Sequence, residues 1–284
     1  MKFSKAKLVF VSILFSSLLV LALAACGSNS AGSSDSAAVN DADKTIKVGA
    51  SPTPHAEILN AVKAELEKEG YTLDIVEFTD YIQPNVALSN KELDANYFQH
   101  KPYLDNYNAE NKTDLEVVLP VHFETMAIYG GKSSDLGKIE EGATIVVPND
   151  TTNEARALLL LQSENIIELK ENVGLEATPN DIVNNPKNIK LLEVEAAAVP
   201  ASLSSSDFAV INGNFALGAG LNPQEALANE SVESLAGQTY ANYLVARPDN
   251  KDSEKIQALV KALKSDAVVE FINSSYSGSV LPAA

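Results

Sequence analysis

Apolar and polar residues alternate along this chain in blocks that predict strands and helices in turn. Short apolar runs at residues 45–50 and 73–78 have the length and composition of buried strands. Between them, residues 52–70 carry Ile58, Val62 and Leu66 at intervals of four, which is the spacing of an amphipathic helix. Continued to residue 121, the alternation predicts a largely parallel sheet covered by helices.

The alternation begins again after residues 130–131, a Gly-Gly pair. Further strands are expected at residues 144–147, 190–194, 208–211 and 240–246, and helices at residues 152–161, 197–204, 214–219, 253–264 and 266–274. The helix over 152–161 is expected to have Thr151, Thr152 or Asn153 as its cap. Two such α/β lobes predict a ligand cleft between them, at the carboxyl ends of strands.

The first 25 residues have the pattern of a signal peptide. Basic residues open the chain, no charge interrupts residues 8–25, and Leu-Ala-Ala precedes Cys26. This junction resembles a bacterial lipobox, which predicts a lipid-modified Cys26, followed through residue 43 by a flexible tether rich in small polar residues. The expected location is the extracytoplasmic face of the cell membrane. A signal anchor and a free thiol are the alternatives.

Composition narrows the classes of function. The chain has 21 Lys and Arg against 38 Asp and Glu, a net charge of −17, or −20 once the three lysines of the signal are removed. Nucleic acid is therefore not an expected partner, because little positive charge is present to neutralise phosphates. Cys26 is the only cysteine, which excludes an intrachain disulfide and a thiolate metal site. Arginine occurs only at positions 156 and 247.

Four segments carry polar side chains where strands meet helices or turns. Residues 94–103 combine aromatic, His, Asn and Gln side chains, which suit either a ligand pocket or an aromatic core. Arg156 lies one turn into a helix whose free N–H groups attract anions, so it is expected to contact a ligand carboxylate or to form a surface ion pair. Asn212 and Asn242 lie at strand ends or within apolar strands, where a structural hydrogen bond is the alternative.

The sequence contains few of the motifs that are typical of enzymes. His55, His100 and His122 are too far apart in sequence to form a recognisable helical metal pair, and no G-x-S-x-G or phosphate-binding loop occurs. We therefore expect no enzyme, no cofactor and no metal. A metal-binding lipoprotein of an ABC importer, an extracellular hydrolase and an adhesin remain as alternatives.

Five motifs resemble the methionine-binding lipoproteins of ABC importers, the MetQ/NlpA family. They lie at residues 78–85, 94–104 (D-A-N-Y-F-Q-H-K-P-Y-L), 147–161, 184–188 and 210–214. The resemblance runs from about residue 44 to the C-terminus. It implies a two-lobed periplasmic-binding-protein-like fold whose first lobe comprises residues 44–124, completed by about 243–284, and whose second lobe comprises residues 125–242.

The resemblance also implies a ligand and a site. The ligand would be L-methionine, with D-methionine or a methionine-containing dipeptide as alternatives, delivered to a membrane permease driven by an ATPase. Arg156 would hold the α-carboxylate, the aromatic residues would line the thioether pocket, and the asparagines would orient the polar end. The implied site consists of Tyr81, Phe98, His100, Tyr103, Asn153, Arg156, Asn212 and Asn242.

Overall fold

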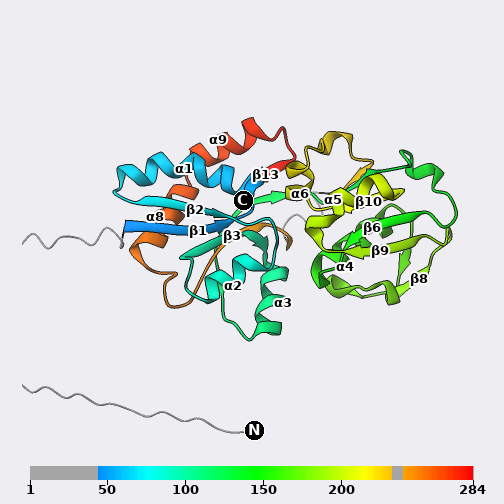
Figure 1. Ribbon diagram of the computed structural model, residues 1–284, viewed down its shortest axis with the longest axis horizontal. Coiled ribbons are helices and arrows are strands. Elements are labelled where there is room, and N and C mark those ends of the chain that lie inside the picture. Colours follow the sequence, from blue (N-terminus) through cyan, green and yellow to red (C-terminus); the bar gives the residue numbers. More distant parts are fainter. Residues whose placement is uncertain (1–43, 232–238, 284) are drawn as a thin grey trace, which may run out of the picture. The chain divides into compact units, whose positions relative to one another are not determined.

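The computed structural model describes residues 44–231 and 239–283 (Figure 1). The expected signal peptide, Cys26 and the tether lie outside these residues. Within the described ranges, no helix has both the length and the apolar character needed to cross a membrane. The strands form two main sheets, which confirms the prediction of an α/β fold with two halves.

The first sheet has six strands in the order β13-β4-β12-β3-β1-β2. β1 pairs in parallel with β2 and β3, whereas β12 runs antiparallel between β3 and β4, and β13 runs antiparallel to β4. Four strands thus share one direction, and the two from the C-terminal part oppose it. The strands are β1 (Thr45–Ala50), β2 (Thr72–Glu77), β3 (Ala95–His100), β4 (Glu116–Glu124), β12 (Asn242–Ala246) and β13 (Val280–Pro282).

The second sheet has five strands in the order β11-β5-β10-β6-β9. β6 pairs in parallel with β9 and β10, and β5 runs antiparallel to β10 and β11. The chain passes from the first sheet to the second after β4 and returns before β12. The strands are β5 (Ala127–Gly130), β6 (Thr144–Pro148), β9 (Lys190–Val194), β10 (Phe208–Ile211) and β11 (Ala228–Asn229); β7 (Glu168–Leu169) and β8 (Ile182–Asn184) form a separate pair.

The helices begin and end within a few residues of the predicted positions. The stretch expected as one helix over 52–70 divides into a π-helical turn, η2 (Pro52–Ala56), and α1. The stretch over 197–204 contains only the short α5 between 3-10 turns. The helices are α1 (Glu57–Lys68), α2 (Gln83–Ser89), α3 (Lys101–Asn111), α4 (Thr151–Ser163), α5 (Val199–Ser202), α6 (Gly213–Gly218), α8 (Glu254–Leu263) and α9 (Asp266–Ser275).

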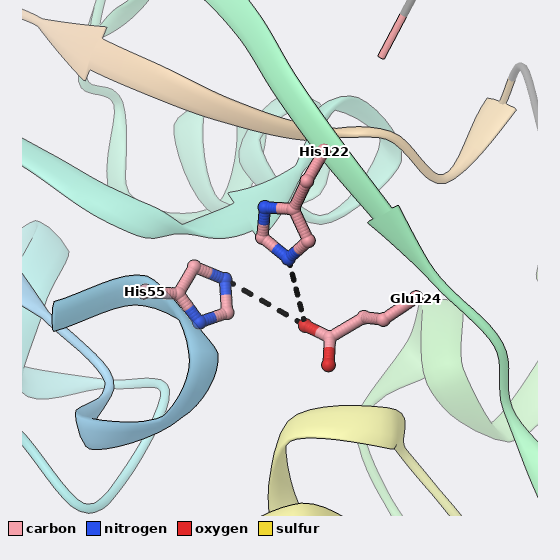
Figure 2. Close-up of side chains that lie close together, drawn as sticks. All are labelled: His55, His122 and Glu124. Atoms are coloured by element: carbon pink, nitrogen blue, oxygen red, sulfur yellow. Dashed lines mark hydrogen bonds and ion pairs between the residues drawn. The ribbon is translucent and has the colours of Figure 1, made fainter. Parts of the chain in front are cut away.

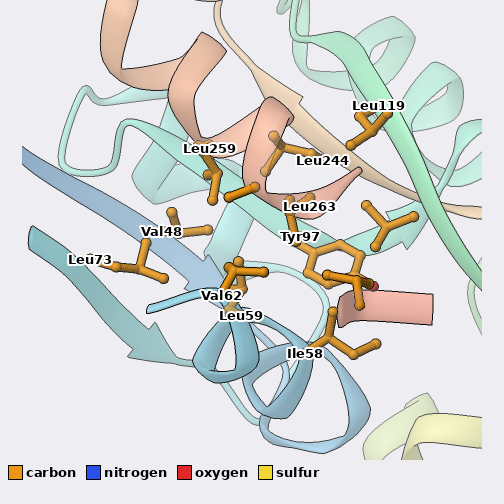
Figure 3. Close-up of a cluster of buried hydrophobic side chains, with 14 of the residues drawn as sticks. Val48, Ile58, Leu59, Val62, Leu73, Tyr97, Leu119, Leu244, Leu259 and Leu263 are labelled. Atoms are coloured by element: carbon orange, nitrogen blue, oxygen red, sulfur yellow. The ribbon is translucent and has the colours of Figure 1, made fainter. Parts of the chain in front are cut away.

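The first sheet is covered on both faces because neighbouring residues of a strand point to opposite sides. Leu244 of β12 packs with Leu59 of α1 and Leu259 of α8 in the main core (Figure 3). The next residue, Val245, joins Leu88 of α2 and the buried face of α3 in a second cluster. Every residue of β3 is buried as a result, so the strand that ends at the site is held rigidly.

The cap of α4 differs from the expectation. Asp150, and not Thr151, Thr152 or Asn153, is the N-cap: its backbone is extended, and its side chain accepts a hydrogen bond from the backbone N–H of Asn153. Thr151 is already the first helical residue. The carboxylate of Asp150 therefore occupies the helix start, where the sequence suggested that a ligand anion would bind.

Candidate ligand site

A small cavity lies where residues attached to the two sheets meet. All eight residues of the expected site line it, so the fold brings them together although they span residues 81–242. Their contact with a ligand stays a prediction. The lining consists of Tyr81, Phe98, Gln99, His100, Tyr103, Glu124, Asn153, Arg156, Asn212, Gly213, Asn214 and Asn242.

One end of the cavity is aromatic. The ring centroids of Tyr81, Phe98 and Tyr103 lie 5.8–6.0 Å from one another, and Phe215 of α6 lies 4.7 Å from Tyr81. The Tyr103 hydroxyl donates to the backbone oxygen of Tyr81 at 2.9 Å, and the Tyr81 hydroxyl donates to Oδ1 of Asn214 at 2.5 Å. These bonds fix the rings and leave their faces and edges for an apolar group.

His100 joins the aromatic end to the polar end. Its Nδ1 accepts from the backbone N–H of Tyr103 at 3.2 Å, which makes it the side-chain cap of α3. Because Nδ1 accepts, the proton of the neutral ring is on Nε2, which donates to Oδ1 of Asn153 at 3.2 Å. Burial, together with the charge of Arg156, lowers the pKa of His100 to about 3. The ring is therefore neutral at physiological pH.

Asn153 and Asn212 form the next part of the polar end. Nδ2 of Asn153 donates to both carboxylate oxygens of Asp150, and Nδ2 of Asn212 donates to Oδ1 of Asn153 at 2.7 Å. Oδ1 of Asn212 is buried and has no hydrogen-bond partner among the residues that the structure describes. A buried acceptor without a partner costs free energy, so this atom is suited to a donor on a ligand.

Arg156 is buried and already holds a carboxylate of this chain. Its Nε lies 3.0 Å from both carboxylate oxygens of Glu230, and its Nη2 donates to Glu230 and to the backbone oxygen of Glu124 at 3.0 Å. The side chains are only 4% and 9% exposed, so the ion pair that the sequence left as an alternative is present, but it is buried and not on the surface. The guanidinium also lies over the ring of Tyr240, 4.3 Å from its centroid.

Behind the polar end, His55, His122 and Glu124 form a buried cluster (Figure 2). Nε2 of His55 and Nε2 of His122 lie 3.7 and 3.4 Å from the same oxygen, Oε1 of Glu124. The two histidines are distant in sequence, but η2 and β4 bring their ring centroids within 4.7 Å. They do not form a helical pair, as their sequence spacing indicated, but the fold brings them together from two elements.

Among the described residues, this cluster is the group that could hold a metal ion, because its donor atoms lie within 4.8 Å of one another. Three of its four ring nitrogens, however, are used in hydrogen bonds, and only Nδ1 of His55 lacks a partner among the described residues. Nε2 of His55 lies 3.1 Å from Oδ1 of Asn242, an oxygen that only accepts, so this nitrogen carries a proton and is not free to ligate. His122 is bonded through Nδ1 to the hydroxyl of Tyr97. The geometry favours a hydrogen-bonded network.

Desolvation dominates the electrostatics of this network. Burial lowers the pKa of His55 to about 4 and that of His122 to about 3. Burial raises the pKa of Glu124 to about 7, although His55 and Arg156 oppose the rise. At neutral pH both imidazoles are uncharged, and the carboxyl group of Glu124 is close to its own midpoint.

Comparison with known proteins identifies the same family that the sequence motifs resemble. The NlpA lipoprotein family matches residues 46–284. The chain belongs to this family. It is 39% identical to the methionine-binding lipoprotein MetQ of Bacillus subtilis over 272 residues, which cover 93% of this chain and 96% of that protein. It is 40% identical to the D-methionine-binding lipoprotein MetQ of Escherichia coli over 240 residues, covering 83% and 87%.

Solved structures of similar proteins share the fold. A nutrient-binding protein from Burkholderia cenocepacia, solved bound to methionine, superposes with a TM-score of 0.80 at 41% identity. The match covers 84% of this chain and 100% of that one. This chain is thus an NlpA lipoprotein in both sequence and architecture.

Four residues of this NlpA lipoprotein line the cavity without having been predicted: Gln99, Glu124, Gly213 and Asn214. Gln99 lies inside the 94–104 motif, and Gly213 and Asn214 directly follow Asn212, so proximity to the motifs would have indicated three of them. Glu124 had no such neighbour. Its only indication was a carboxylate at the end of an apolar strand, beside His122.

Proposed function

We propose that this protein is a substrate-binding lipoprotein that captures L-methionine for an ABC importer. One observation carries the proposal: one cavity has at one end a buried arginine and acceptors that lack a partner within the described ranges, and three aromatic rings at the other end. A zwitterionic amino acid with a polarizable side chain matches both ends. The names of its NlpA relatives, several of which are methionine-binding proteins, support the same ligand.

The polar end is suited to both charges of an amino acid. Arg156 supplies a fork-shaped cation for the α-carboxylate. Oε2 of Glu124 and Oδ1 of Asn212 are buried acceptors that lack a partner among the described residues, and both residues line the cavity. An α-ammonium offers three donors, so it would satisfy both oxygens at once.

The aromatic end is suited to the thioether. Tyr81, Phe98 and Tyr103 present ring edges and faces around one space. A sulfur atom near an aromatic ring gains about 0.3–1.5 kcal/mol for each contact. Three such rings favour methionine over an aliphatic side chain of equal length.

The proposed setting is a membrane. A lipid on Cys26 would anchor the protein at the extracytoplasmic face, and residues up to 43 would let the binding domain reach a permease whose transport an ATPase drives. We assign the protein no catalytic role. Its task is capture and delivery.

Native mass spectrometry of protein purified without refolding tests the ligand. An added mass equal to methionine is expected, and calorimetry after ligand removal should then show tight binding of L-methionine. Titrations with D-methionine, glycyl-methionine and norleucine rank the alternatives. A retained compound of another mass, with no heat on addition of methionine, would refute the proposal.

A further inference from the structure

The two oxygens of Glu124 have different surroundings. Oε1 faces the rings of His55 and His122, as Figure 2 shows. Oε2 is buried, has no hydrogen-bond partner among the described residues, and belongs to a side chain that lines the ligand cavity. The start of α6 comes close to it: a Cβ atom at Gly213 would lie 2.8 Å from Oε2. The backbone at Gly213 therefore packs closely against Oε2.

Among the residues that the structure describes, no uncompensated cation lies beside this carboxyl group. His55 and His122 are neutral because of their burial, and Nε2 of His55 is committed to Asn242. Arg156 is the nearest permanent cation, but Glu230 neutralises it through an ion pair. Titratable and charged groups from several elements face or influence Glu124. They are His55 of η2, Tyr81 of the loop after β2, Tyr97 of β3, His122 of β4, Arg156 of α4 and Tyr276 after α9.

We propose that Glu124 determines specificity for the α-amino group of the ligand by exchanging its own proton for it. In the empty cavity at mildly acidic pH, Oε2 carries a proton. When the amino acid enters, the O–H bond of the carboxyl group breaks, the proton leaves to solvent, and the α-ammonium donates to Oε2 in its place. The inference rests on the proposed function, because it requires a ligand with an α-ammonium group.

The pKa of about 7 that burial gives Glu124 places this exchange in an accessible range. Ligand binding needs the ionised carboxylate. The affinity is therefore fully expressed above the pKa of the empty protein and falls as the pH drops below it. An analogue with a neutral group in place of the ammonium gains nothing from ionisation of Glu124, so discrimination in favour of the amino acid should weaken at low pH.

Calorimetry of the ligand-stripped protein with L-methionine tests the exchange. Titrations at pH 6 in two buffers of different ionisation enthalpy should show release of about one proton per ligand, falling to near zero at pH 8.5. The affinity should be about 100-fold weaker at pH 5 than at pH 8. The 2-hydroxy analogue of methionine should show a much smaller change over the same range.

Glu124 and Glu154 have similar pKa values, so substitutions at these two positions form a matched pair. Glu124→Gln keeps the shape but cannot ionise, so it should lose proton release and the pH dependence of affinity, and should bind the hydroxy analogue nearly as well as methionine. Glu154→Gln is the control. Burial and the neighbouring Glu193 raise the pKa of Glu154 to about 7, but it does not line the cavity. This variant should behave as the unmodified protein does.

His55→Gln removes one of the two rings that face Oε1 of Glu124 and leaves the carboxyl group itself unchanged. We expect it to move the midpoint of the affinity–pH curve while methionine still binds, and circular dichroism checks that each variant is folded. Equal affinity from pH 5 to 8 with no buffer dependence would refute the exchange and leave methionine binding intact. Absence of methionine binding at every pH would refute both proposals. Loss of affinity on adding a chelator would mean that the cluster holds a metal, and the exchange would be wrong.

Discussion

The two ends of the cavity are built in different ways. The three rings of the aromatic end come from one stretch of chain, residues 81–103, and only Tyr81 is also held from a distant segment, by Asn214 and Phe215. The polar end draws Glu124, Arg156, Asn212 and Asn242 from four separate elements. Each of these groups is held by a residue distant in sequence, as Glu230 holds Arg156.

This contrast assigns different tasks to the two ends. Apolar contact is non-directional, so a ring that moves slightly still contacts the ligand. Buried charges must be paired and oriented, or they are costly. We therefore expect affinity to depend most on the polar end, and the choice among side chains to depend on the aromatic end.

The largest effect is expected from Arg156→Ala. The substitution removes the cation for the α-carboxylate and leaves Glu230 buried without its partner. Methionine binding should weaken by about 3–5 kcal/mol, more than 100-fold. Calorimetry measures the affinity, and chemical denaturation measures the accompanying loss in the free energy of unfolding.

Arg247→Ala is the matched control because it is the only other arginine. Arg247 donates to the backbone oxygens of Leu88 and Leu93, outside the cavity. It should lower the free energy of unfolding without changing the affinity. Equal loss of affinity in both variants would contradict the assignment of Arg156 as the residue that binds the α-carboxylate.

A smaller effect is expected at the aromatic end. Phe98→Ala should weaken methionine binding by about 2–3 kcal/mol through lost apolar contact and lost sulfur–ring contact. Phe98→Leu retains most of the volume and should mainly reduce the preference for methionine over norleucine. Phe271→Ala, on α9 away from the cavity, is the control. An unchanged preference in Phe98→Leu would show that the ring does not select the thioether.

Glu230→Gln should change affinity in the opposite direction. With the neutralising carboxylate gone, Arg156 attracts the ligand carboxylate more strongly, and the affinity should rise about 3- to 10-fold. The free energy of unfolding should fall by about 1–3 kcal/mol because the guanidinium loses its charged partner. The uncompensated cation should also lower the pKa of Glu124, so binding should persist to lower pH. Weaker binding would instead assign Glu230 to the positioning of Arg156.

No effect on either end is expected from Cys26→Ser. The variant should lack its lipid and appear in the culture medium or the soluble fraction, with methionine affinity unchanged. Fractionation followed by calorimetry measures both. Reduced affinity in the soluble variant would place part of the binding domain before residue 44.

Local patterns predicted the fold and the aromatic end because each depends on residues that are near one another in sequence. The burial of Ile58, Val62 and Leu66 follows directly from their helical spacing. The pairs Arg156–Glu230 and His55–His122 could not be predicted, since each joins residues more than 60 positions apart that meet only in the folded chain. The prediction of the α4 cap failed for a local reason: all four residues at 150–153 are able to cap a helix, and the helix begins at Thr151, which places Asp150 at the cap.

The position of β12 has a consequence for how the protein forms. β12 lies between β3 and β4, although the whole second sheet separates it from them along the chain. During synthesis, residues 45–124 thus emerge with two strand edges whose common neighbour has not yet been made, and open edges invite wrong pairing. The part of the fold that is synthesised first is completed last.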